Sequence, residues 1–201
     1  ENMNDDLRNM VWRGHYLGTK PADVMLHVPV DVHFAASNRQ VKIFGPYHLE
    51  TLALARISER VPAPSSSAAE SFAVFEEERI GVELDTHASD FLLNLREGAL
   101  RQNVVHYRSL AEAAAALKAG EIAAVMGTRG ELEASLGGHG GVAIDTLAMP
   151  ELRLTGWPLG MAVKADSSQL AEALSGALAD LQRSGELTRI FEATGVRHRV
   201  P

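Results

Sequence analysis

The sequence predicts an α/β fold, and three features of the chain carry that prediction. Short apolar runs typical of strands alternate with longer stretches whose apolar residues recur at helical spacing. Glycine or proline stands beside several of these runs, where it would end a strand or a helix. Ser109 precedes an alanine-rich stretch, with Glu112 three residues further on, which is typical of a helix N-terminus. Since a helical crossover returns the chain to the same sheet edge, the alternation predicts parallel strands covered by helices.

The first quarter of the chain predicts one helix and two strands. Apolar residues at helical spacing indicate a helix over residues 6–14, which ends at a glycine. The run ADVMLHVPVD, residues 22–31, is typical of a buried strand closed by a proline. A second short strand is expected over residues 41–44, halted by the glycine and the proline that follow it. The apolar stretch TLALARI, residues 51–57, fits either a helix or a strand.

A loop rich in proline and serine, VPAPSSSAAE at residues 61–70, leads into a short helix near residues 72–77. A regular repeat of strand and helix follows. Its expected strands are RIGVEL (79–84), NVVHY (103–107) and IAAVMG (122–127), and its expected helices begin near Thr86 or Ser89, at Ser109 and at Arg129.

The glycine cluster GGHGG, residues 137–141, ends the third of these helices and is expected to be a flexible loop tip. Residues 149–155 are expected to be irregular or extended, and WPLGMAVKAD, residues 157–166, to be a strand. Two helices, over residues 170–183 and 187–194, are expected to close the chain.

Composition excludes several classes of protein. The chain has 201 residues, of which 46% are hydrophobic and 22% charged, as in soluble globular proteins. Its 19 basic and 26 acidic residues give a net charge of −7, which disfavours nucleic acid and anionic membranes as partners. No apolar run approaches the roughly 20 residues that membrane insertion requires. With no cysteine, the chain has neither a thiol nucleophile nor a disulfide.

Several segments, in this order, resemble the type 2 periplasmic solute-binding proteins of the amino-acid-binding kind, family 3. They are ADVMLHVP, FGPY, F…FEEERIGVE, L…LKAGEIAAVMG, WPLGMAVKAD and the tail L…AL..LQRSGELTRIFEATGV. A narrower resemblance rests on DVMLHVPVD…GPYHLETLALA and AAVMG…LE. These stretches look like the solute-binding-like proteins encoded with bacterial quinoprotein (methanol or alcohol) dehydrogenases.

The resemblance implies two lobes, each a mainly parallel sheet flanked by helices, which close by a hinge on a ligand in the cleft. Residues 1–56 with 158–201 would form lobe I, and residues 57–157 lobe II. The family begins with a strand–helix–strand unit, whereas this chain starts in the helix that follows it, so lobe I is expected to be incomplete. The resemblance also implies a periplasmic location, with the signal peptide outside this sequence.

Nine residues are candidates for ligand binding, because the cleft of such a sheet lies at the carboxyl ends of its strands. They are His27, Asp31, Arg39 and Tyr47 in lobe I, and Thr86, His87, Ser89, Thr128 and Arg129 in lobe II. Thr86 and Ser89 lie at an expected helix N-terminus, which favours an anion, and a neighbouring arginine would supply a bidentate clamp. The alternative is that both hydroxyls simply cap the helix.

The resemblance argues against a standard α-amino acid as the ligand. Amino-acid-binding members carry a threonine-x-x-arginine in the first lobe and an aspartate after a second-lobe strand, which binds the ammonium group. Here only Arg39 could replace that arginine, and the stretch MGTRG has no acid until Glu131. We therefore expect either a different small ligand or none.

Neither a cofactor, a metal site nor an enzymatic activity is expected. His27, Asp31 and His33 lie close together in the sequence, with His48 and Glu50 further on, but their spacing matches no established metal motif. The sequence has no GxSxG, no P-loop and no GxGxxG after a strand. A catalytic relative would need a general acid, for which His87 and Glu131 are the candidates.

Three roles share this fold. The first is a periplasmic protein that delivers a small solute to an ABC importer permease. The alternative is an accessory or maturation protein that binds a quinoprotein alcohol dehydrogenase and has a vacant or non-transport cleft. The third, an effector-binding domain of a transcription regulator, is disfavoured because no DNA-binding helix pair precedes the chain.

Overall fold

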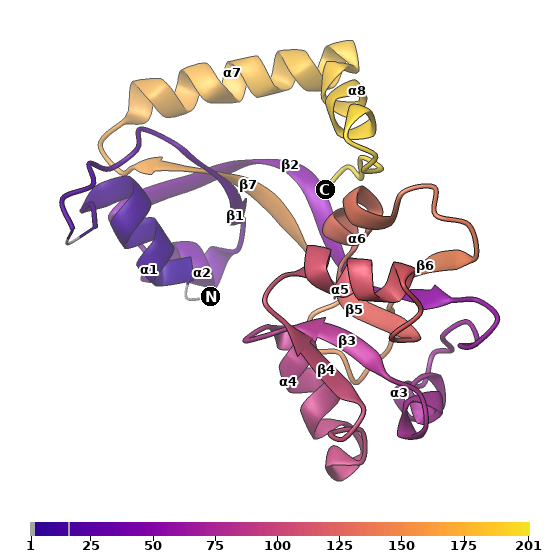
Figure 1. Ribbon diagram of the computed structural model, residues 1–201. Coiled ribbons are helices and arrows are strands. Elements are labelled where there is room, and N and C mark those ends of the chain that lie inside the picture. The colour runs from indigo at the N-terminus through magenta and orange to yellow at the C-terminus, as the bar shows by residue number, and fades with distance from the viewer. Residues whose placement is uncertain (1–2, 16) are drawn as a thin grey trace. The chain divides into compact units, whose positions relative to one another are not determined.

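The computed structural model describes residues 3–15 and 17–201 and confirms the α/β class. The chain folds into two units (Figure 1). Unit 1 contains the chain up to Glu50, Trp157–Ala193 and His198–Pro201, and unit 2 contains Thr51–Gly156 and Thr194–Arg197. Within the described residues, no helix has the length and apolar character needed to cross a membrane.

The elements of unit 1 come from both ends of the chain. From the N-terminal part come α1 (Met3–Leu7), the π-helical turn η1 (Arg8–Trp12), β1 (Met25–Pro29), α2 (Val32–Ser37) and the first part of β2 (Val41–Ile57). From the C-terminal part come β7 (Gly156–Lys164), α7 (Ser168–Ser184) and α8 (Glu186–Ala193). In the sheet, β7 lies between β1 and β2, and it pairs with β1 in antiparallel orientation.

The core of unit 1 includes one compact buried cluster, and a group of aromatic rings holds the end of the chain. Its buried cluster consists of Leu7, Val11, Val28, Val41 and Ala162. On β2, the His48 ring stacks on Phe191 at 4.5 Å between centroids, and Phe191 stacks on His198 at 4.9 Å. The backbone N–H of Leu49 also donates to the carbonyl of Arg199 over 2.8 Å. These contacts attach α8 and the C-terminal residues to β2.

Two sequence predictions in unit 1 are wrong. The run around β1 is not a buried strand, because β1 lies at the edge of the sheet, where Val28 is buried but Leu26 is 58% exposed. The strand beginning at Val41 is not halted after four residues, since β2 continues through Gly45 and Pro46 for 17 residues. Gly45 adopts a φ of +63°, and Pro46 is exposed, a position where a strand tolerates the missing N–H donor.

Unit 2 contains the rest of β2 and the regular repeat of strands and helices. Its further elements are α3 (Ala68–Ser71), η2 (Ala73–Glu76), β3 (Ile80–Glu83), α4 (His87–Asn94), η3 (Leu95–Gly98), β4 (Val104–Tyr107), α5 (Leu110–Lys118), β5 (Ala124–Thr128), α6 (Arg129–Leu136) and β6 (Val142–Thr146). The strand order is β4–β3–β5–β2–β6. As predicted, β3 is parallel to β4 and to β5, whereas β2 is antiparallel to β5 and β6.

Two layers of helix cover the sheet of unit 2 (Figure 1). Alternate residues of the strands point to opposite faces, so Ala53, Ala55 and Val125 pack in one cluster with α5 and α6. On the other face, Phe72 is fully buried and contacts Phe75 and Phe91 at ring distances of 5.8 and 5.5 Å. The sheet is therefore buried on both faces, and its polar groups collect at the strand ends.

Candidate functional site

Three loops of unit 2 meet at one edge of the sheet, because β3, β4 and β5 are parallel. The N–H of Leu84, just after β3, donates to the carbonyl of Tyr107 at the end of β4 over 3.0 Å. On the other side of β3, Val82 pairs with Met126 of β5. We name the residues at and just beyond the ends of these strands, Leu84–His87, Arg108–Ser109 and Thr128–Glu131, the carboxyl edge. Each of the helices α4, α5 and α6 begins there.

Thr86 and Ser89 both have partners within the fold. The Thr86 hydroxyl donates to the carbonyl of Glu83 over 2.8 Å and accepts the N–H of Ser89 over 3.2 Å, so it caps α4. The Ser89 hydroxyl is buried and lies 2.9 Å from Nε2 of His106. His87, the first residue of α4, is exposed at the same edge. The expected cap is present at Thr86 but not at Ser89, whose hydroxyl contacts His106 instead, and His87 is the exposed side chain of this group.

The loop after β4 carries an arginine that the sequence analysis did not single out. Ser109 caps α5 by accepting the N–H of Glu112 over 3.2 Å, as predicted. The Glu112 carboxylate in turn accepts the N–H of Arg108 over 3.2 Å. Arg108 is exposed, and within the described residues its guanidinium makes neither a hydrogen bond nor an ion pair. Its signal in the sequence was its position directly after a parallel strand, beside a helix cap.

The loop after β5 brings an acid to the strand end. The Thr128 hydroxyl donates to the Glu131 carboxylate over 2.6 Å, and Glu131 is exposed. Nε of Arg129 donates to Glu133 over 2.8 Å, and its Nη1 donates to Thr146 over 2.5 Å. Glu133 also accepts the N–H of Arg197 over 2.9 Å. Arg129 therefore contributes to holding α6, β6 and residue 197 together, whereas Thr128 and Glu131 face solvent.

The four candidates of unit 1 lie at two places in its sheet. His27 forms a bulge in β1 with a φ of +64°, and its N–H donates to the Tyr47 hydroxyl over 2.9 Å. Asp31 caps α2 by accepting the N–H of Phe34 over 2.7 Å, and its side chain is exposed. Burial raises the pKa of Tyr47, and the hydrogen bond from His27 partly opposes that shift.

Arg39 lies away from the other three candidates of unit 1. It precedes Gln40, whose carbonyl accepts the N–H of Ala165 at the far end of β7. Asp31 follows Val30, whose N–H donates to Pro158 at the near end of β7. Seven residues of β7 separate these two points, a length of about 23 Å at roughly 3.3 Å per residue. The structure thus brings His27 and Tyr47 together but not Arg39.

The histidines mentioned as possible metal ligands do not assemble into a site. His48 is 2% exposed and stacks on Phe191, and His33 is exposed on α2. Among the residues that the structure describes, no group of three or more His, Asp and Glu side chains could hold a metal ion.

Comparison with known proteins identifies the fold. No protein-family model and no curated protein matches the chain. Among solved structures, an ancestral cationic amino acid solute-binding protein aligns with a TM-score of 0.65 and 15% identity, over 86% of this chain and 69% of that one. An amino acid ABC transporter substrate-binding protein from Streptococcus pneumoniae, bound to L-arginine, aligns with a TM-score of 0.57 and 17% identity, over 84% and 65%. The GluR0 ligand-binding core in complex with L-glutamate aligns with a TM-score of 0.58 and 18% identity, over 86% and 72%. The chain therefore has the periplasmic binding protein type 2 fold.

Proposed function

We propose that this chain is a periplasmic solute-binding protein that binds a small organic solute and passes it to an ABC importer permease. Its fold is that of proteins whose names record amino acid binding, which supports the general role. The observation that carries the proposal is the carboxyl edge of unit 2, where an arginine, two threonines and an acid follow three parallel strands. In open α/β sheets ligands bind at this edge.

The solute that suits this edge has an anionic group and a hydrogen-bond donor or cationic group some distance apart. Arg108 and the N-termini of α4 and α5 favour an anion, and Glu131 favours a cation. Arg108 follows β4 and Thr128 ends β5, with β3 between them. At about 4.8 Å between neighbouring strands, the two strand ends are roughly 10 Å apart. In an α-amino acid the ammonium and carboxylate groups are attached to the same carbon and lie much closer together than these two strand ends. The edge therefore favours a longer solute, such as an ω-amino acid.

Two isomers test this proposal directly. The compounds δ-aminovalerate and norvaline have the same atoms and charges but differ in the separation of the amine from the carboxylate. We expect δ-aminovalerate to raise the unfolding temperature of the chain more than norvaline does, because ligand binding stabilises the folded state by mass action. The panel should also include the standard amino acids, dicarboxylates and diamines.

Two variants test whether Arg108 and Glu131 contact the solute. We expect Arg108→Gln and Glu131→Gln each to weaken binding of δ-aminovalerate about tenfold or more, since hydrogen bonds to charged groups contribute about 1.5–3 kcal/mol. Arg79→Gln is the matched control, because Arg79 is an exposed arginine directly before β3, at the opposite edge of the sheet. If no compound of the panel raises the unfolding temperature, the proposed solute-binding role is wrong. If Arg79→Gln weakens binding as much as Arg108→Gln, the solute does not bind at the carboxyl edge.

A further inference from the structure

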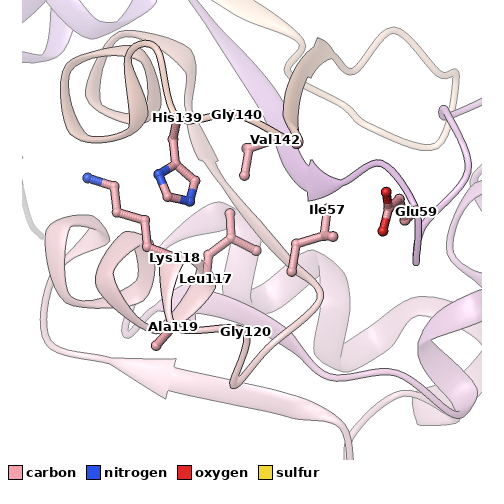
Figure 2. Close-up of a pocket in the computed structure, with 10 residues that line it drawn as sticks. Ile57, Glu59, Leu117, Lys118, Ala119, Gly120, His139, Gly140 and Val142 are labelled. Carbon is pink, nitrogen blue, oxygen red and sulfur yellow. The ribbon is translucent and has the colours of Figure 1, made fainter.

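Unit 2 contains a pocket of about 330 Å³ at the end of its sheet opposite to the carboxyl edge (Figure 2). Its walls are the end of β2, the C-terminus of α5 and the loop that precedes β6. Ile57 pairs with Val142 at this end, whereas Leu52 pairs with Thr128 at the carboxyl edge. Five residues of β2 separate the two places, a length of about 17 Å. The pocket is therefore distinct from the site of the proposed function.

The floor of the pocket is apolar. Leu117 is 1% exposed and belongs to the buried cluster under α5 and α6, and the partly buried Ile57 and Val142 pack against that cluster. In Figure 2 these three side chains lie between the Lys118 side chain and the Glu59 side chain. An apolar ligand body would therefore cover hydrophobic surface that is now partly open to water.

The two ends of the pocket differ in charge. The Lys118 and His139 side chains lie at one end, and the Glu59 side chain lies at the other end, beyond Ile57 (Figure 2). Within the described part of the chain, none of these three side chains makes a hydrogen bond or an ion pair. Lys118 and His139 are thus available to a ligand.

Two features keep the pocket open and suited to an anion. A Cβ atom built on Gly120, Gly140 or Gly141 would have no neighbour within 4 Å, so no packed side chain fills that wall. Two carbonyl oxygens at and just beyond the end of α5 already have donors, which lessens their repulsion of an anion: Leu117 accepts from Gly120, and Gly120 accepts from Arg60 over 3.0 Å. The glycine cluster, expected from the sequence to be a flexible loop tip, forms part of this wall.

We propose that this pocket is a second ligand site, for a small organic monocarboxylate with an apolar body. The carboxylate lies between Lys118 and His139, and the apolar body lies over Ile57, Leu117 and Val142. Glu59 excludes a second anionic group at the far end. The volume is at the lower end of the range for small-molecule sites, which sets the size of the ligand.

Three compounds of similar size and different charge test the site: benzoate, benzamide and benzylamine. In titrations followed by ligand-observed NMR, we expect benzoate to bind at least about fivefold more tightly than benzamide, and benzylamine to bind weakest. Equal binding of benzoate and benzamide, or no binding of benzoate at about 20 mM, overturns the proposal.

Variants of the protein then test where benzoate binds. Lys118→Gln, at an exposed position, is expected to weaken benzoate binding about tenfold. Gly140→Leu is expected to abolish it by filling the pocket, since Gly140 has open space and no left-handed backbone conformation. Lys164→Gln, at an exposed lysine of unit 1, is the matched control and should leave benzoate binding unchanged. Loss of benzoate binding in Arg108→Gln but not in Lys118→Gln would overturn the second site and leave the proposed function intact.

Discussion

The contact between Gly127 of β5 and Leu110 of α5 determines how closely the N-terminus of α5 approaches the sheet. A Cβ atom at position 127 would lie 2.5 and 2.6 Å from the two methyl carbons of Leu110 and 3.1 Å from its Cγ. Leu110 is 5% exposed and belongs to the buried cluster, so it has little room to move. We therefore predict that Gly127→Ala destabilises unit 2.

The expected magnitude follows from two opposing effects. Overpacking a well-filled core costs about 1–3 kcal/mol. The backbone at Gly127 is not left-handed, so alanine fits it without strain and restricts the unfolded chain, which stabilises by about 0.4–1 kcal/mol. The net expected loss in the free energy of unfolding is about 1–2 kcal/mol. In a Leu110→Ala background the colliding atoms are absent, so the same substitution should stabilise by up to about 1 kcal/mol.

Urea unfolding of the four proteins in this cycle, followed by far-UV circular dichroism, measures the effect. Both tryptophans, Trp12 and Trp157, lie in unit 1, so their fluorescence reports that unit and should change little. The reasoning is refuted if Gly127→Ala has the same effect in both backgrounds, because the coupling between positions 110 and 127 would then be zero.

Two further predictions concern a partly buried ion pair and a partly buried phenol. Arg56→Met should cost about 2–3 kcal/mol in urea unfolding, because buried Arg56 donates to Asp145 over 2.7 Å and to the carbonyl of Val61 over 2.9 Å. Arg60→Met, which breaks the more exposed pair with Glu78, should cost less than about 1 kcal/mol, and equal losses would contradict this ranking. Burial raises the pKa of Tyr47 above its ordinary value of 10.0, so the folded state favours the neutral phenol. That stabilisation is present below pH 10 and is lost as the pH rises through the raised value, so Tyr47→Phe should flatten the alkaline decline in unit 1 stability, measured by tryptophan fluorescence. Parallel pH profiles of the two proteins would contradict it.

Local signals in the sequence predicted much of unit 2. Ser109 and Thr86 cap helices as expected, because an N-cap depends on residues three positions apart. The parallel strands followed from their alternation with helices. The strand β6 was not predicted, since its five residues are only partly buried and it pairs with β2 alone among the described strands.

Features that depend on the pairing of strands could not be predicted from local signals in the sequence. Gly45 and Pro46 are strong local signals to end a strand, yet β2 continues because its pairing and the exposure of Pro46 satisfy the backbone there. The contact between the Thr128 hydroxyl and the Glu131 carboxylate is local, but the pairing of β3 with β4 and β5 places both residues at the same edge as the loops after β3 and β4. Arg108 gained significance only when the structure placed it at the same edge as these two residues.

Amide hydrogen exchange of the wild-type chain, with and without δ-aminovalerate, tests most directly the claim that a solute binds at the carboxyl edge. We predict increased protection in residues 84–90, 108–112 and 128–133, where α4, α5 and α6 begin. Residues 57–60 and 139–142, which flank the second pocket, should exchange at unchanged rates. Protection confined to those latter residues, or absent from the first turns of all three helices, would contradict the account.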